Sequence, residues 1–179
     1  MSIVLRPWVR QDASALVAAA QSASDLAPQF GGADLSSLAA AEAFIEQSLQ
    51  FGERVKNWAV VKDSVAVGNV GASAIEFRHD TAWMYYWLSP DARGKGYATG
   101  ALNAVCDWAF GTGLYRLELG HRVNNPASCR VATAAGFQAE GIEREKLRYG
   151  TDRYDVETHA RLATDSAPTV GLPAIPVSG

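Results

Sequence analysis

Cysteine is scarce in this sequence, and long apolar runs are absent. The 179 residues include two cysteines, Cys106 and Cys129, which lack the density of a secreted disulfide scaffold and the paired spacing of a zinc site. We therefore expect small buried thiols and no metal. Residues 1–10 contain no apolar segment of signal-peptide type, and no apolar run approaches membrane-spanning length. These absences predict a cytoplasmic protein without a membrane partner.

The net charge is also small. The 16 Lys and Arg residues are outnumbered by 19 Asp and Glu residues, and the net charge of -3 argues against a broad nucleic-acid surface. Any anion-binding site must therefore be local. Hydrophobic residues make up 48% of the chain, which is ordinary for a globular enzyme or binding module. We expect a single domain over residues 1–163 and a Pro-rich tail over residues 164–179, either flexible or packed against a partner chain.

The first third of the chain predicts a strand and two helices. Residues 2–8 are typical of a strand, and Asp12 is a candidate N-cap for the helix that follows. A second amphipathic helix is expected after Ser36–Ser37, with Gly52 closing it at its C-terminal end. The intervening residues 24–34 combine proline with a Gly-Gly pair, so we expect a loop there.

The middle of the chain predicts a meander and a crossover. Three β-rich runs, 57–63, 65–77 and 81–88, are joined by turns too short for parallel connections, so they should pair in antiparallel fashion. A helix over 97–110 and a strand over 115–123 come next. Since strand, helix and strand follow in that order, the strands on either side of this helix should be parallel.

The remaining elements complete an α+β chain. Asn125 and Pro126 should begin a short helix that ends before Gly136, and residues 138–150 and 152–162 should form two more strands. The expected fold class is a mixed sheet, mostly antiparallel, with one parallel crossover in its middle and flanking helices.

The stretch "RGKGYA", residues 93–98, lies between the strand at 81–88 and the helix at 97–110. The first N–H groups of a helix have no partner within it, the helix dipole is positive there, and glycines allow a phosphate to approach closely. Arg93 and Lys95 add positive charge. The alternative is an ordinary turn with solvated cations. A Walker loop does not fit, because glycine follows Lys95. A dinucleotide-binding loop stays as a weaker alternative: Glu118 lies where a ribose-binding acid would, but such a fold would not place three antiparallel strands before its loop.

The segment "YYWLSPDARGKGYATGAL" followed by "YRLELGHRVNNPASCRVATAAGF" resembles the GNAT superfamily of acetyl-CoA-dependent N-acetyltransferases, most of all its RimJ/RimL branch. The motifs are Arg93-x-x-Gly96-x-Ala98, Asn125-x-x-Ser128 and Gly136-Phe137. The resemblance covers roughly residues 3–162. It implies the GNAT fold, in which the two parallel strands splay apart to admit the cofactor.

The resemblance also implies a coenzyme A site. The backbone around Leu88 would pair with the pantetheine arm, and Asn125 and Ser128 would lie beside it. Asn125 could equally serve only as a helix cap. Arg122 and Arg130 would hold the outlying phosphate. The N–H groups expected to bind the pyrophosphate are those of Arg93, Gly94, Lys95, Gly96, Tyr97 and Ala98.

Many GNAT enzymes have a tyrosine acid at the position of Ala132, so the resemblance indicates Ser128 as its substitute, hydrogen-bonded to the departing thiolate. Serine in the first turn of a helix can also serve only to bond the cap residue. Glu118 is the first candidate for the base, acting through water, although a salt-bridged strand residue is an equally simple interpretation. Glu76 and His121 are weaker candidates.

The predicted reaction is direct attack of a primary amine on acetyl-CoA, with strand amides near Leu88 stabilising the oxyanion. The resemblance implies that the acceptor is a protein or peptide N-terminal α-amine, of the ribosomal-protein type. A small amine such as an antibiotic, polyamine or amino acid is the alternative, and an acyl-CoA sensor without catalysis is a rival of another class. The expected partners are acetyl-CoA and this acceptor. A second copy of the chain is a further partner, because the tail could pack against it in a homodimer.

Overall fold

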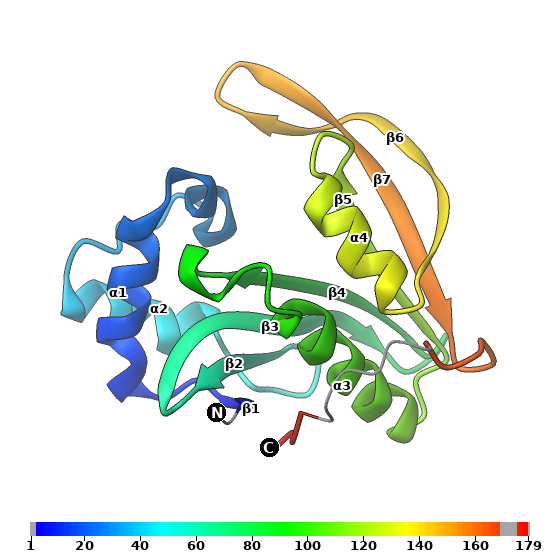
Figure 1. Ribbon diagram of the computed structural model, residues 1–179, viewed down its shortest axis with the longest axis horizontal. Helices are drawn as coiled ribbons and strands as arrows, with labels where there is room; N and C mark the ends of the chain where they lie inside the picture. The colour runs from blue at the N-terminus through cyan, green and yellow to red at the C-terminus, as the bar shows by residue number, and fades with distance from the viewer. Residues whose placement is uncertain (1–2, 169–174, 179) are drawn as a thin grey trace.

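The computed structural model describes residues 3–168 and 175–178. Its centre is a strongly twisted mixed sheet (Figure 1). The described residues form seven strands in the order β1-β2-β3-β4-β5-β7-β6. Their bounds are β1 Ile3–Pro7, β2 Lys56–Lys62, β3 Val65–Glu76, β4 Thr81–Leu88, β5 Arg116–Arg122, β6 Gln138–Tyr149 and β7 Asp152–Leu162.

Helices cover both faces of this sheet. The α-helices of the described residues are α1 Ala13–Ser22, α2 Leu38–Ser48, α3 Tyr97–Gly111 and α4 Pro126–Ala134. Strand β2 is buried on both sides: Trp58 and Val60 belong to the core that includes α3 and α4, whereas Ala59 and Val61 belong to the core under α1 and α2. Because successive strand residues point to opposite faces, a nearly continuous apolar run fits this position.

The predicted meander and crossover are confirmed. Strands β2, β3 and β4 pair in antiparallel fashion, and β4 pairs with β5 in parallel. That parallel ladder is short, since only Thr81–Trp83 of β4 face 116–118 of β5. Beyond it, β4 continues along β3 and β5 continues along β7. The sheet therefore splits into two halves between β4 and β5, as Figure 1 shows.

Two details near the N-terminus differ from the sequence predictions. Residues 24–34 do not form a plain loop, because Ser24–Phe30 make a 3-10 helix (η2) that buries Leu26 and Phe30. Helix α2 ends at Ser48, and Leu49 is its C-cap, so Gly52 does not close it. Apolar contacts of η2 with the core outweigh the local turn signals in the first case.

Asp12 occupies the N-cap position of α1, but its carboxylate makes no cap hydrogen bond to that helix. It accepts instead from both terminal nitrogens of Arg6, at 2.6 and 2.8 Å, and from the backbone N–H of Val9 at 3.1 Å. This buried carboxylate thus ties β1 to the start of α1 through a bidentate ion pair.

The end of the tail lies on the edge of β1. The N–H of Leu5 donates to Pro176, and the N–H of Ser178 donates to Leu5, both at 2.9 Å. Ile175 reaches α3 at Gly100, where an added Cβ would lie 2.8 Å from its Cδ1 atom. The prediction of a flexible extension or a partner-binding arm therefore does not describe residues 175–178, because they pair with the edge of β1 and Ile175 and Val177 pack against the core that includes α3. The rest of that prediction falls partly on residues 169–174 and 179, outside the described part.

In the described part of the chain, no helix combines the length and the apolar character needed to cross a membrane.

Candidate active site

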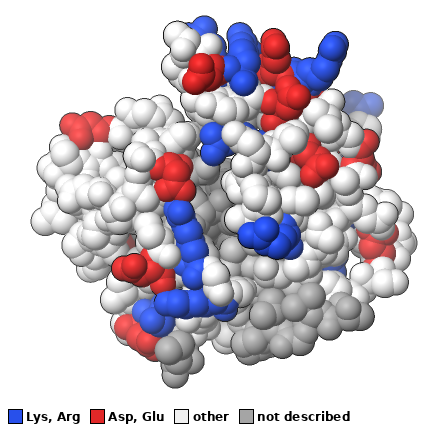
Figure 2. Space-filling view, turned by 45° about the horizontal axis from the view of Figure 1, so that its top comes forward, with Lys and Arg blue, Asp and Glu red and all other residues white. Residues whose placement is uncertain are grey.

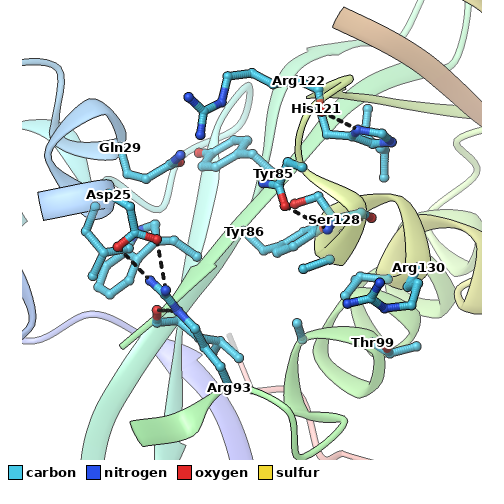
Figure 3. A pocket seen from close by; sticks show the side chains of 18 of the residues that line it. Asp25, Gln29, Tyr85, Tyr86, Arg93, Thr99, His121, Arg122, Ser128 and Arg130 are labelled. Carbon is cyan, nitrogen blue, oxygen red and sulfur yellow. Dashed lines mark hydrogen bonds and ion pairs between the residues drawn. The ribbon is translucent and has the colours of Figure 1, made fainter. Parts of the chain in front are cut away.

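A cavity of about 580 Å³ occupies the gap between β4 and β5. Figure 2 shows the hollow on this face, with positive side chains on either side of it. Figure 3 shows Asp25 and Arg93 on one side of the cavity and Ser128 and Arg130 on the other. The walls come from β4, the glycine loop, the end of β5, α4, η2 and two residues of β6. The cavity is therefore a consequence of the short parallel ladder.

The glycine loop delivers the start of α3 to this cavity. Gly94 and Gly96 have φ angles of 71° and 78°, a left-handed conformation that suits glycine. Gly96 is the N-cap of the 15-residue helix α3, and Gly94, Gly96 and the residues 97–99 line the cavity. The backbone of a glycine-rich loop and the positive end of a helix dipole meet here, which is the chemistry that suits a pyrophosphate.

The cationic side chains of the loop already have protein partners. Arg93 donates from Nε to the carbonyl of Leu88 at 3.0 Å, and its terminal nitrogens donate to Asp25 at 2.8 and 3.3 Å. Lys95 donates to the carbonyl of Asp91 at 2.6 Å and does not line the cavity. In this loop the backbone is therefore the group available to an anion, and Arg130 on α4 adds a charged wall.

Asn125 and Ser128 meet at the start of α4, on the opposite wall. The Asn125 side chain accepts from the N–H of Ser128 at 3.2 Å, which confirms the predicted cap. Tyr86 of β4 reaches across the gap and donates to the Ser128 carbonyl at 3.2 Å. Burial raises the pKa of Tyr86, so the phenol stays protonated. This contact was not predicted from the sequence, in which its only signal is an aromatic residue on the splayed strand.

Arg122 and Tyr149 line another part of the cavity. The guanidinium of Arg122 lies 5.4 Å from the ring centre of Tyr149 and 5.1 Å from that of Tyr154, within cation-π range. Tyr85 also lines the cavity, and its hydroxyl donates to Asn57 at 2.8 Å. Burial raises the pKa of Tyr85 to about 12, so this phenol cannot accept a proton near neutral pH.

The two predicted carboxylate bases do not line the cavity. Glu118 accepts from Nε of Arg116 at 2.6 Å, which matches the alternative of a salt-bridged strand residue. Glu76 accepts from the backbone N–H groups of Arg78 and His79, and these bonds lower the pKa of Glu76 while fixing the β3–β4 turn. His121 is the one candidate base that does line the cavity.

A family model described as an acetyltransferase (GNAT) domain matches residues 2–138. The chain belongs to the GNAT acetyltransferase family. The matched residues include the glycine loop before α3, the Asn125 cap and the strands β4 and β5 that border the gap.

Individual relatives agree with this assignment. The ribosomal-protein-serine acetyltransferase of Escherichia coli (strain K12) is 32% identical over 109 residues, and this match covers 60% of each chain. The GNAT chain thus aligns with about three fifths of that relative's length.

Solved structures support the same GNAT fold. The microcin C7 self immunity acetyltransferase MccE, in complex with acetyl-CoA and AMP, superposes with a TM-score of 0.80 at 22% identity, covering 90% of this chain and 92% of MccE. The ribosomal alpha-N-protein acetyltransferase RimL, in complex with coenzyme A, gives a TM-score of 0.80 at 22% identity, covering 90% and 94%.

Proposed function

We propose that the protein transfers the acetyl group of acetyl-CoA to a primary amine, most favourably a protein or peptide α-amine. The observation that carries this proposal is that one continuous cavity joins the start of α3 to the gap between β4 and β5. One wall offers helix-start amides for a pyrophosphate, and beyond Trp83 the edge of β4 no longer pairs with β5, which leaves room for an extended arm. MccE and RimL, which have this fold, were solved with acetyl-CoA and coenzyme A.

In the proposed complex, the amides from Gly94 to Ala98 hold the pyrophosphate, and Arg130 balances its charge. The pantetheine arm lies along β4 near Leu88. The thioester then lies between β4 and the start of α4, where the Ser128 hydroxyl hydrogen-bonds the departing thiolate. Ala132, which replaces the tyrosine of many relatives, is completely buried and contributes only packing.

The charges around the cavity support an α-amine rather than a polyamine. Among the described residues that line it, Asp25 is the only carboxylate, and Arg93 already neutralises it. Arg122 would repel a second ammonium group. An α-amine has a pKa of roughly 7.7–8.0 against about 10.4 for lysine, so it loses its proton to water without a strong base. An acceptor with an acidic group near its N-terminus would gain from Arg122.

The test is a thiol-release assay with acetyl-CoA and four acceptors at equal concentration. These are a Ser-initiated peptide with acidic residues at positions two and three, the same peptide with lysines there, spermidine, and Nα-acetyl-lysine. We expect the acidic peptide to react best. Arg122→Gln should reduce its advantage over the lysine peptide about 5-fold or more, whereas Arg78→Gln on the distant β3–β4 turn should not.

Turnover of spermidine in preference to both peptides would refute the α-amine assignment but leave acetyl transfer intact. Calorimetric binding of acetyl-CoA without turnover of any acceptor would favour the sensor. Binding of NAD in place of acetyl-CoA would refute the cofactor assignment.

A further inference from the structure

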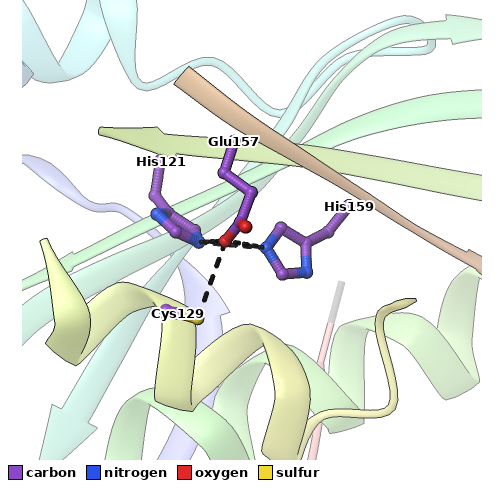
Figure 4. Close-up of side chains that lie close together, drawn as sticks. All are labelled: His121, Cys129, Glu157 and His159. Atoms are coloured by element: carbon purple, nitrogen blue, oxygen red, sulfur yellow. Dashed lines mark hydrogen bonds and ion pairs between the residues drawn. The ribbon is translucent and has the colours of Figure 1, made fainter. Parts of the chain in front are cut away.

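Four groups with the donor atoms of a metal site lie together between α4 and the strands β5 and β7 (Figure 4). His121 comes from β5, Cys129 from α4, and Glu157 and His159 from β7. One ligand atom of each residue lies within 4.8 Å of all the others. The acetyl-transfer proposal does not use this cluster as a unit, although His121 also lines the cavity.

The shortest distances converge on one point. Nε2 of His121 lies 3.0 Å from Nε2 of His159 and 3.3 Å from Oε2 of Glu157. That same carboxylate oxygen lies 3.0 Å from Nε2 of His159 and 3.7 Å from Sγ of Cys129. Two ring nitrogens and a carboxylate oxygen thus form a nearly equilateral triangle, and the sulfur lies on its helix side.

The hydrogen bonds define which ring atoms are available. Nδ1 of His121 lies 3.0 Å from the carbonyl of Arg122, which can only accept, so the neutral ring carries its proton on Nδ1. Its Nε2 lone pair then points into the triangle. His159 is 3% exposed, and among the described residues its Nδ1 has no partner, so its polar contacts are all made through Nε2.

We propose that His121, Cys129, Glu157 and His159 bind one Zn²⁺ ion. Zinc takes nitrogen, sulfur and carboxylate ligands at about 2.0–2.3 Å, so tetrahedral ligand atoms lie about 3.3–3.8 Å apart. The distances of 3.0, 3.3 and 3.7 Å require only small side-chain shifts to reach that geometry. The Arg122 carbonyl supplies the outer hydrogen bond that orients a ligating histidine.

The position of the cluster indicates how an ion would reach it and how the bound ion would stabilise the fold. His121 lines the cavity, which is the path by which an ion reaches the cluster. The bound ion joins α4 to the β5–β7 half of the sheet at three elements. Because it binds the folded chain, it raises the melting temperature, and the rise grows with the logarithm of the free ion concentration once that exceeds the dissociation constant. This inference does not depend on the acetyl-transfer proposal.

The experiment measures Zn²⁺ and Co²⁺ binding to the metal-free full chain. We expect one ion per chain, a rise in melting temperature with Zn²⁺, and a thiolate-to-cobalt charge-transfer band with Co²⁺. Cys129→Ala should abolish that band and weaken Zn²⁺ binding roughly 10-fold or more, since even outer-shell changes at metal sites cost about 10–100-fold. His159→Ala should also weaken binding.

The chain contains matched controls. Its other cysteine is replaced in Cys106→Ala and its exposed histidine in His79→Ala, and both variants should retain the band and the affinity. Circular dichroism spectra like the parent's identify folded variants, and Cys129→Ala suffices if His159→Ala fails to fold. Binding that is absent from the parent, or unchanged in Cys129→Ala and His159→Ala, would overturn the proposal.

Discussion

Replacing Asn69 with alanine should destabilise the protein measurably. Asn69 and Asn57 lie on neighbouring strands, and each is 1% exposed. Asn69 accepts from Nε1 of Trp8 at 2.8 Å and donates to Oδ1 of Asn57 at 3.2 Å. Oδ1 of Asn57 also accepts from the hydroxyl of Tyr85, and its amide donates to Gln50 at 3.1 Å. A buried polar network therefore links three strands and positions Tyr85 in the cavity wall.

The magnitude follows from counting what Asn69→Ala leaves unpaired. The buried Trp8 N–H loses its acceptor, at a cost of about 1–3 kcal/mol, and the bond to Asn57 is worth about 0.5–1.5 kcal/mol. Oδ1 of Asn57 keeps Tyr85 as a donor. The expected loss is about 2–4 kcal/mol, equivalent to a melting-temperature drop of roughly 4–16 °C for a chain of this size.

Urea unfolding of the parent, Asn69→Ala, Tyr85→Phe and the double variant measures this. Tyr85→Phe removes one of two donors to Asn57 and should cost only about 0.5–1.5 kcal/mol. The double variant leaves Oδ1 of Asn57 without a donor from the network, so it should lose more than the sum of the single changes. A smaller loss for Asn69→Ala than for Tyr85→Phe, or strictly additive losses, would refute this network.

Three further predictions concern single side chains. Ser128→Ala should lower kcat about 10–100-fold with little change in the KM for acetyl-CoA, since a bond to the departing thiolate is worth about 1.5–3 kcal/mol; steady-state kinetics with an unchanged kcat would contradict that role. Glu118→Gln should keep kcat within about twofold, because that carboxylate pairs with Arg116 outside the cavity; a large loss in the same assay would restore it as the base. Iodoacetamide should label Cys129 before Cys106 in metal-free native protein. Burial raises the pKa of Cys106 to about 12, and the thiolate is the form that reacts. Equal labelling of the two cysteines in mass spectrometry would contradict this order.

Much of the fold could be predicted, because its signals are local. The meander, the parallel crossover, the glycine loop and the Asn125 cap each depend on residues close together in the chain. The predictions that were wrong depend on distant contacts. Residues 24–30 become helical because Leu26 and Phe30 join a core, and Ile175 docks where Gly100 leaves room.

The sequence alone determined the order of strands and helices along the chain and the position of the glycine loop. Hydrophobic periodicity and the placement of glycines are signals carried by residues close together in the sequence. Only the tertiary structure decided which side chains meet. The β5–β7 register sets His121 opposite Glu157 and Leu119 opposite His159. Helix α4 then places Cys129 next to His121, Glu157 and His159. Strand register and helix docking arise from packing across the whole domain, so no local pattern could have predicted that cluster, or that the ion pair of Glu118 with Arg116 lies outside the cavity.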